Sequence, residues 1–196
     1  DAGATEEEEI FPLSAVIDGI LQSWAHAHRV EMPDLIVMPL GSDQSQTAAL
    51  DQFAERPETS IFAPGTEARA NVIADQQLDL GGRVLTVLPT PGLNDSAITI
   101  YDPWSDLLLT GNTFYPGRLV IRDFDAYRES LLRLVQLAQE EPISHIFGGR
   151  IEMTNRPGLD HRLRSNYRPE EHSLQLEPGL LETALQAVNV INGETD

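Results

Sequence analysis

Two reactive side chains are missing from this sequence: it contains no cysteine, and all 13 of its basic residues are arginine. Without cysteine the chain forms no disulfide, carries no thiolate nucleophile and offers no sulfur ligand to a metal. Without lysine it makes no Schiff base and lacks the phosphate-binding lysine of a P-loop. Long apolar runs are missing as well, because none approaches the roughly 20 residues that a membrane-spanning helix needs.

Positive charge is scarce, since 31 acidic residues against 13 arginines give a net charge of −18 at pH 7. Phosphate binding needs clustered cations, so we do not expect this chain to bind nucleic acid. Its 196 residues, 41% of them hydrophobic, are enough for one globular domain with a core. The first residues lack both the basic and the apolar part of a signal peptide, which leaves two alternatives open: no signal, or a signal already removed. The compartment stays undetermined.

The hydrophobic pattern predicts alternating strands and helices after an acidic tail over residues 1–9, and residues 10–196 are expected to form a single domain. Strands are expected over residues 11–18, 34–38, 60–63, 83–88, 96–102, 107–110 and 144–147. Helices are expected over 19–28, 44–55, 66–74, 124–140 behind an N-cap at Asp123, and 178–190, with a long polar segment over 148–177. This order is typical of a layered α/β domain with mixed strand pairing.

A series of short motifs runs through the chain in a fixed order. They are Asp34-Leu-Ile-Val-Met-Pro-Leu-Gly-Ser-Asp-Gln44, Leu80-Gly-Gly-Arg83, Thr90-Pro-Gly-Leu93, Leu109-Thr-Gly-Asn-Thr113, Tyr115-Pro-Gly-Arg118 and Gly148-Gly-Arg-Ile-Glu-Met153. With this order and spacing, residues 16 to 190 resemble the metallo-β-lactamase superfamily. The resemblance implies an αββα sandwich and a hydrolase that holds one or two zinc ions. The zinc ions lower the pKa of a bound water toward 7.

The resemblance matches the family's seven zinc ligands to seven positions of this chain. They are Pro39, Gly41, Asp43, Gln44, Leu93, Asn112 and Arg150. Asp43 alone keeps the residue that the resemblance implies, and a catalytic zinc keeps three protein ligands. We therefore expect no metal and no cofactor. Arg150 would supply a permanent positive charge beside Asp43 in place of the cation.

Three further side chains are weak candidates for chemistry. Asp43 either takes part in a reaction or has a structural role, in which it caps the helix that follows it or accepts backbone N–H bonds in its loop. His161 and His172 lie in the polar segment over 148–177 and are candidates for a general base or a new metal site. The alternative is a solvated loop with an Arg–Glu network.

Five of the 13 arginines fall within nineteen positions: Arg150, Arg156, Arg162, Arg164 and Arg168. In an acidic chain this clustering predicts an anion site or a contact for an acidic partner. The alternative is pairing with the chain's own acids.

The resemblance also implies a strand pair ahead of residue 15, where this sequence has only a short tail. The fold is therefore expected to be trimmed at its N-terminus. Either the first strands are missing from this sequence, or a homodimer partner or another protein covers the open sheet edge. The leading hypothesis for function is a catalytically degenerate, metal-free relative that serves as a binding or assembly module. The alternative is an ester, thioester or lactone hydrolase whose active site has moved to Asp43, Arg150, His161 and His172.

Overall fold

The computed structural model of the protein describes residues 5–163, 165 and 167–191, and the chain divides into two compact units. Unit 1 comprises residues 1–70 and unit 2 residues 71–196. Among the described residues, no helix combines the length and the apolar character that crossing a bilayer requires.

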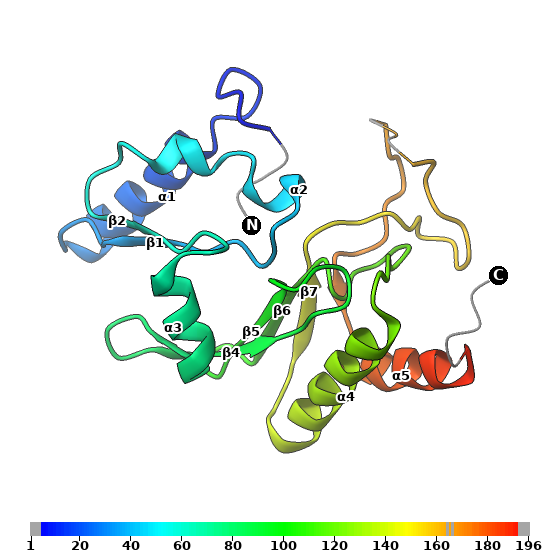
Figure 1. The fold of residues 1–196 in the computed structure, drawn as a ribbon. Coiled ribbons are helices and arrows are strands. Elements are labelled where there is room, and N and C mark those ends of the chain that lie inside the picture. The colour runs from blue at the N-terminus through cyan, green and yellow to red at the C-terminus, as the bar shows by residue number, and fades with distance from the viewer. Residues whose placement is uncertain (1–4, 164, 166, 192–196) are drawn as a thin grey trace. The chain divides into compact units, whose positions relative to one another are not determined.

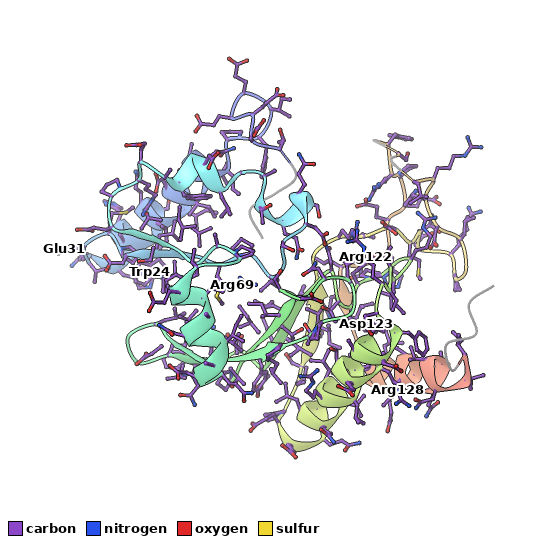
Figure 2. All side chains as sticks on the ribbon, viewed as in Figure 1. Trp24, Glu31, Arg69, Arg122, Asp123 and Arg128 are labelled. Atoms are coloured by element: carbon purple, nitrogen blue, oxygen red, sulfur yellow. The ribbon has the colours of Figure 1, made fainter. Side chains whose placement is uncertain are left out.

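Unit 1 is built around a short parallel strand pair. Its elements are α1 (Leu13–His28), β1 (Leu35–Val37), α2 (Gln44–Thr47), the 3₁₀ helix η1 (Leu50–Phe53), β2 (Thr59–Ile61) and the first part of α3 (Glu67–Asp75). β1 and β2 pair in parallel with Leu35 opposite Thr59 (Figure 1). The buried side chain of Arg69, labelled in Figure 2, donates to the carbonyl oxygens of Pro39 and Phe62 and so ties α3 to the end of β1.

The predicted strand over residues 11–18 is wrong, because α1 begins at Leu13 and continues to His28. Val16 and Ile17 favour a strand locally, but the apolar residues recur every fourth position as far as Trp24. Helical geometry places Leu13 and Ile17 on one face, where they line an apolar cavity together with β1. The single helix predicted over 44–55 is instead two short ones, α2 and η1.

Unit 2 contains a six-stranded mixed sheet with the strand order β3-β4-β5-β6-β7-β8. The strands are β3 (Gln77–Asp79), β4 (Val84–Pro89), β5 (Ile98–Asp102), β6 (Leu107–Gly111), β7 (His145–Gly148) and β8 (Gln175–Leu176). β3 to β6 form an antiparallel meander, β6 and β7 are parallel, and β8 returns antiparallel to β7. The predicted strands over 83–88, 96–102, 107–110 and 144–147 are confirmed within one or two residues, whereas β3 was not predicted.

Two helices pack together on the sheet of unit 2. They are α4 (Phe124–Glu140) and α5 (Gly179–Ile191), seen side by side in Figure 1. Tyr127, Leu131 and Leu134 recur at helical spacing on α4, and they join strand residues such as Leu108 and Ile146 in one buried core. The helix predicted over 124–140 is confirmed, as is its N-cap: the Asp123 carboxylate accepts a hydrogen bond of 2.9 Å from the backbone N–H of Ala126.

Candidate functional site

The candidate site of unit 2 lies where two loops leave neighbouring parallel strands. One loop follows β6 and the other follows β7, and the backbone N–H of Gly149 donates to the Gly111 carbonyl over 2.7 Å. Gly148 allows the loops to approach closely, because a Cβ at this position would lie 2.3 Å from the Cβ of Tyr115. Tyr115 is buried beneath this crossing, and burial raises the pKa of its phenol.

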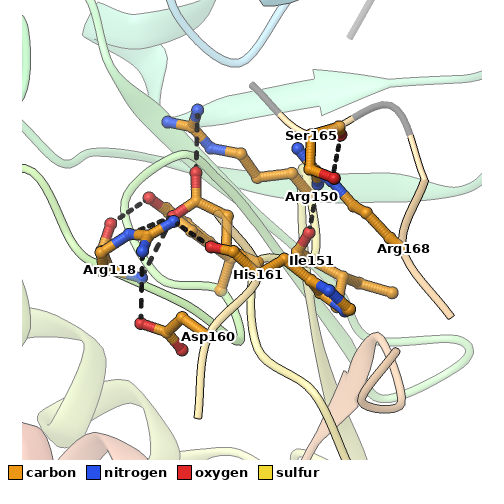
Figure 3. Close-up of polar contacts among 9 residues, drawn as sticks. Arg118, Arg150, Ile151, Asp160, His161, Ser165 and Arg168 are labelled. Carbon is orange, nitrogen blue, oxygen red and sulfur yellow. Dashed lines mark hydrogen bonds and ion pairs between the residues drawn. The ribbon is translucent and has the colours of Figure 1, made fainter. Parts of the chain in front are cut away.

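A buried carboxylate, Glu152, contacts two arginines at this crossing, Arg118 and Arg150, both labelled in Figure 3. Its Oε2 lies 3.5 Å from Nε of Arg118, and its Oε1 lies 3.6 Å from a terminal nitrogen of Arg150. The Arg150 guanidinium also stacks over the Tyr115 ring at 4.7 Å, and the Tyr115 hydroxyl donates to the Arg118 carbonyl. Two cations around one carboxylate compensate its burial and occupy both of its oxygens.

Asp160 and His161, which follow Glu152 in the same loop, also contact Arg118 or Glu152. Arg118 donates to the His161 carbonyl over 2.9 Å and lies 3.8 Å from the Asp160 carboxylate. The His161 backbone N–H in turn donates to the Glu152 carbonyl. The ring atom Nε2 of His161 is buried without a hydrogen-bond partner among the described residues. A buried polar nitrogen of this kind is unusual in a folded protein.

The two candidate histidines, His161 and His172, make different contacts and do not form one cluster. His161 belongs to the Arg118–Glu152 group, whereas the His172 ring lies 2.6 Å from the Ser173 carbonyl and its backbone N–H donates to Met153. Asp43 is in unit 1, at the N-cap position of α2, where its side chain makes no capping hydrogen bond to the helix. The alternative structural role of Asp43, accepting backbone N–H bonds in its loop, stays a prediction. The predicted pairing of Asp43 with Arg150 stays a prediction.

The arginines of the polar segment have different surroundings. Arg168 donates to the carbonyl oxygens of Ile151 and Ser165, over 2.6 and 3.0 Å, as Figure 3 shows. Arg156 lies 3.8 Å from the carboxylate of Glu170 on the exposed side. Arg162 is exposed, and Arg164 lies outside the described residues.

The residues at the positions of the implied zinc ligands do not fit a zinc ion. In unit 2, Leu93 and Asn112 are both 8% exposed, and Arg150 brings a cation to its position. In unit 1, a side chain at Gly41 would have to displace the buried amide of Gln46, whose Oε1 lies 2.3 Å from the required Cβ. Over the part of the chain that the structure describes, no three His, Asp or Glu side chains gather in a way that suits a metal.

Sequence reasoning singled out Arg150 but missed its partners Glu152, Arg118 and Tyr115. All three lie within the motifs Tyr115–Arg118 and Gly148–Met153, which the sequence analysis had already identified. Their contacts depend on the crossing of two loops 34 residues apart, which no local pattern reveals.

Comparison with known proteins identifies the architecture. No family model and no curated protein matches the sequence. Solved structures do match, including the metallo-β-lactamase FIM-1 from Pseudomonas aeruginosa in its mono-zinc form, with a TM-score of 0.60 at 12% identity over 98% of this chain and 78% of that one. The metallo-β-lactamase of Hirschia baltica gives a TM-score of 0.58 at 10% identity, covering 96% of this chain and 78% of that one. The enzyme of Pontibacter korlensis gives 0.57 at 13% identity, with 96% and 80% covered. The chain therefore has the metallo-β-lactamase fold.

Proposed function

We propose that this protein is a catalytically degenerate member of its fold, one that binds no catalytic zinc and serves as a binding or assembly module. The observation that carries the proposal is the state of Arg150. Its guanidinium stacks on Tyr115 and contacts Glu152, at the position where the resemblance implies a histidine ligand. A guanidinium keeps its proton at any ordinary pH and donates no lone pair to a metal.

The other ligand positions support the same proposal. Leucine, proline and glycine side chains offer no donor atom, and an asparagine or glutamine oxygen is a weak ligand for zinc compared with imidazole or carboxylate. Loss of a single ligand would leave a weakened site. Loss of six out of seven removes the coordination sphere.

A binding role also has a candidate surface in unit 2. Residues 150–168 carry five arginines against the two acids Glu152 and Asp160, in a chain whose net charge is −18. On this segment Leu159, Leu163 and Tyr167 are 50, 73 and 79% exposed. Exposed arginine and tyrosine beside apolar side chains are typical of protein interfaces, and the charge favours an acidic partner.

An assembly role is supported by the open strand pair of unit 1. Parallel strands are normally buried in larger sheets, whereas β1 and β2 form a sheet of two among the described residues. An apolar cavity of about 210 Å³ beside β1 is lined by Leu13, Ile17 and Phe53 together with residues 35–38. We include in the proposal that a homodimer partner or another protein covers this edge.

Metal analysis tests the proposal. Protein purified without a tag is expected to carry less than about 0.1 equivalent of zinc or iron by mass spectrometry, and its melting temperature is expected not to change when zinc is added. A sample treated with chelator and dialysed provides the control. Stoichiometric metal, together with a rise in melting temperature of several degrees on adding zinc, would overturn the proposal.

The alternative of a relocated hydrolase site rests on one observation: Nε2 of His161 is buried without a hydrogen-bond partner among the described residues. Its test is an assay with ester, thioester and lactone substrates. The variants are Asp43→Asn, Arg150→Met, His161→Ala and His172→Ala, with the exposed His26→Ala as control. Turnover that one of the four abolishes in a folded protein, and that His26→Ala retains, would replace the binding module by an enzyme.

A further inference from the structure

The guanidinium of Arg150 in unit 2 has hydrogen-bonding capacity that its neighbours leave largely unused. Its Nε is buried without a partner among the described residues, although a guanidinium carries five N–H donors. Its Nη1 lies 3.6 Å from Oε1 of Glu152, well beyond the roughly 2.7–2.9 Å of a charge-assisted hydrogen bond. Arg168 in the same segment, by contrast, donates to two backbone carbonyl oxygens over 2.6 and 3.0 Å.

The same guanidinium is held in a fixed orientation. It stacks over the ring of Tyr115 at 4.7 Å, and that ring is itself buried and tied by its hydroxyl to the Arg118 carbonyl. The Arg150 side chain is nevertheless 34% exposed, so a ligand from solvent can reach it. A planar guanidinium oriented in advance matches the two oxygens of a carboxylate and loses little entropy when it binds one.

The charges around Arg150 leave room for one negative charge. The contacts described above join Arg118, Arg150 and Arg168 to the acids Glu152 and Asp160, which gives this group one positive charge more than negative ones. The two loops as a whole, residues 112–123 and 149–172, carry seven arginines and five acidic residues, so their remaining acids do not cancel this excess. A monoanion neutralises the group. A dianion such as phosphate would leave it negative in a chain of net charge −18.

We propose that Arg150 binds a carboxylate group, whose two oxygens accept hydrogen bonds from its terminal nitrogens in exchange for the 3.6 Å contact with Glu152. Glu152 stays paired after this exchange, because its Oε2 keeps the backbone N–H of Arg118 at 3.3 Å and the Arg118 Nε at 3.5 Å. The inference rests on the proposed binding module and names the chemistry of its ligand. A free organic acid and an Asp or Glu side chain of an acidic partner both supply this group. One bidentate contact gives a Kd on the order of 1 mM for a single carboxylate.

NMR titration of the full, metal-free chain at pH 7 and constant ionic strength tests the site. The probes are sodium acetate and a tetraglutamate peptide with blocked ends, and sodium chloride and sodium phosphate serve as comparison anions. The Nε–H signal of Arg150 and the backbone amide signals of residues 149–152 are expected to shift and saturate with acetate. Chloride is expected to give no saturable shift, and phosphate is expected to bind more weakly than acetate.

Two matched variants separate the guanidinium from its charge. Arg150→Lys keeps the charge but removes the planar pair of donors, and it is expected to weaken acetate binding by about tenfold. The control is Arg156→Lys, at a 71% exposed side chain of the same segment, which is expected to bind acetate like the wild type. Melting temperatures close to that of the wild type show that both variants are folded.

The outcomes either support the site or overturn it. No saturable shift of the wild type up to about 100 mM acetate, phosphate that binds more tightly than acetate, or Arg150→Lys that binds acetate unchanged would each overturn the inference. Tetraglutamate that binds at least about tenfold more tightly than acetate assigns the carboxylate to an acidic partner, and similar affinities assign it to a small acid. Metal content measured before chelation keeps this inference apart from the proposed function: zinc-free protein without carboxylate binding overturns the inference alone, and stoichiometric zinc overturns the proposed function.

Discussion

Asp102 in unit 2 is a buried carboxylate with several hydrogen-bond donors around it. Its Oδ1 accepts from Nε of Arg83 over 3.0 Å and from the backbone N–H of Trp104 over 3.1 Å, and its Oδ2 accepts from Arg83 and from the Ser105 hydroxyl. The hydrogen bonds from Arg83, and then those from Ser105 and Trp104, lower the pKa of Asp102 to about 2, against the opposing effect of burial.

Replacing this carboxylate is expected to cost stability in a pH-dependent way. A carboxyl group whose pKa is lower in the folded than in the unfolded chain stabilises the fold above the unfolded pKa near 4. It loses this contribution as the pH falls toward 2. Asp102→Asn is therefore expected to lower the free energy of unfolding by about 2 kcal/mol at pH 7. Urea unfolding of both proteins at pH 7 and pH 2.5 measures it, and the difference has to shrink at the lower pH. A difference that is equal at both pH values would contradict this account.

For single residues, the sequence predicts the turns they form better than the side chains they contact. The Asp-Pro-Trp-Ser sequence of residues 102–105 favours the turn that follows β5. The ion pair did not, because Arg83 reaches Asp102 only through the register that sets Thr86 opposite Tyr101. Register depends on the pairing of two whole strands, and no single residue specifies it. The contact of Arg150 with Glu152 was missed for a similar reason, since it arises where two loops cross.

Among the helices and strands, α4 offers a direct test of an N-cap residue predicted from the sequence. Asp123 precedes the helix and accepts the N–H of Ala126, a group that has no partner inside the helix. Asp123→Ala is expected to lower the free energy of unfolding by about 1 kcal/mol, whereas Asp123→Asn keeps a capping oxygen and is expected to lose only a few tenths. Urea titrations followed by circular dichroism compare the two. Equal losses would show that the charge near the helix end matters and the cap does not.

The contrast between α4 and α1 shows when the apolar pattern of a sequence predicts a helix correctly. On α4 the apolar residues cover one narrow face, so the period was clear and its bounds were predicted correctly. On α1 they extend over the buried face and the exposed face with Val16, Ile20 and Trp24, so residues 11–18 resembled a strand. The three-residue strand β3 was missed because it is too short to show a period, and it forms by pairing with β4.

The whole molecule is dominated by its negative charge. With a net charge of −18, mutual repulsion of the carboxylates opposes the compact state, and salt screens it. Raising NaCl from about 0.01 to 0.3 M, where the screening length falls from about 30 to 6 Å, is expected to raise the melting temperature by several degrees. Circular dichroism at 222 nm follows the transition. A melting temperature that falls with added salt would mean that attractive ion pairs, such as those around Glu152, outweigh the repulsion.

The fold as a whole was accessible from the sequence, whereas the site was accessible only in part. Turn motifs such as Thr90–Leu93 and Gly148–Met153 contain glycine or proline, residues whose backbone preferences shape a turn. They identified the architecture that the structural neighbours share. A shared backbone does not determine which side chains stand at a site, so the resemblance in fold says little about chemistry.

The exposure of Trp24 on α1 also has an optical consequence. The chain has two tryptophans, and the second, Trp104, is 74% exposed in the turn after β5. Both indoles already face water in the folded protein, so unfolding is expected to change the wavelength of tryptophan emission only slightly. Emission from Trp24 instead shifts to shorter wavelength when something covers the outer face of α1. The intrinsic fluorescence of this protein is therefore expected to report a change in the surroundings of Trp24 better than it reports unfolding.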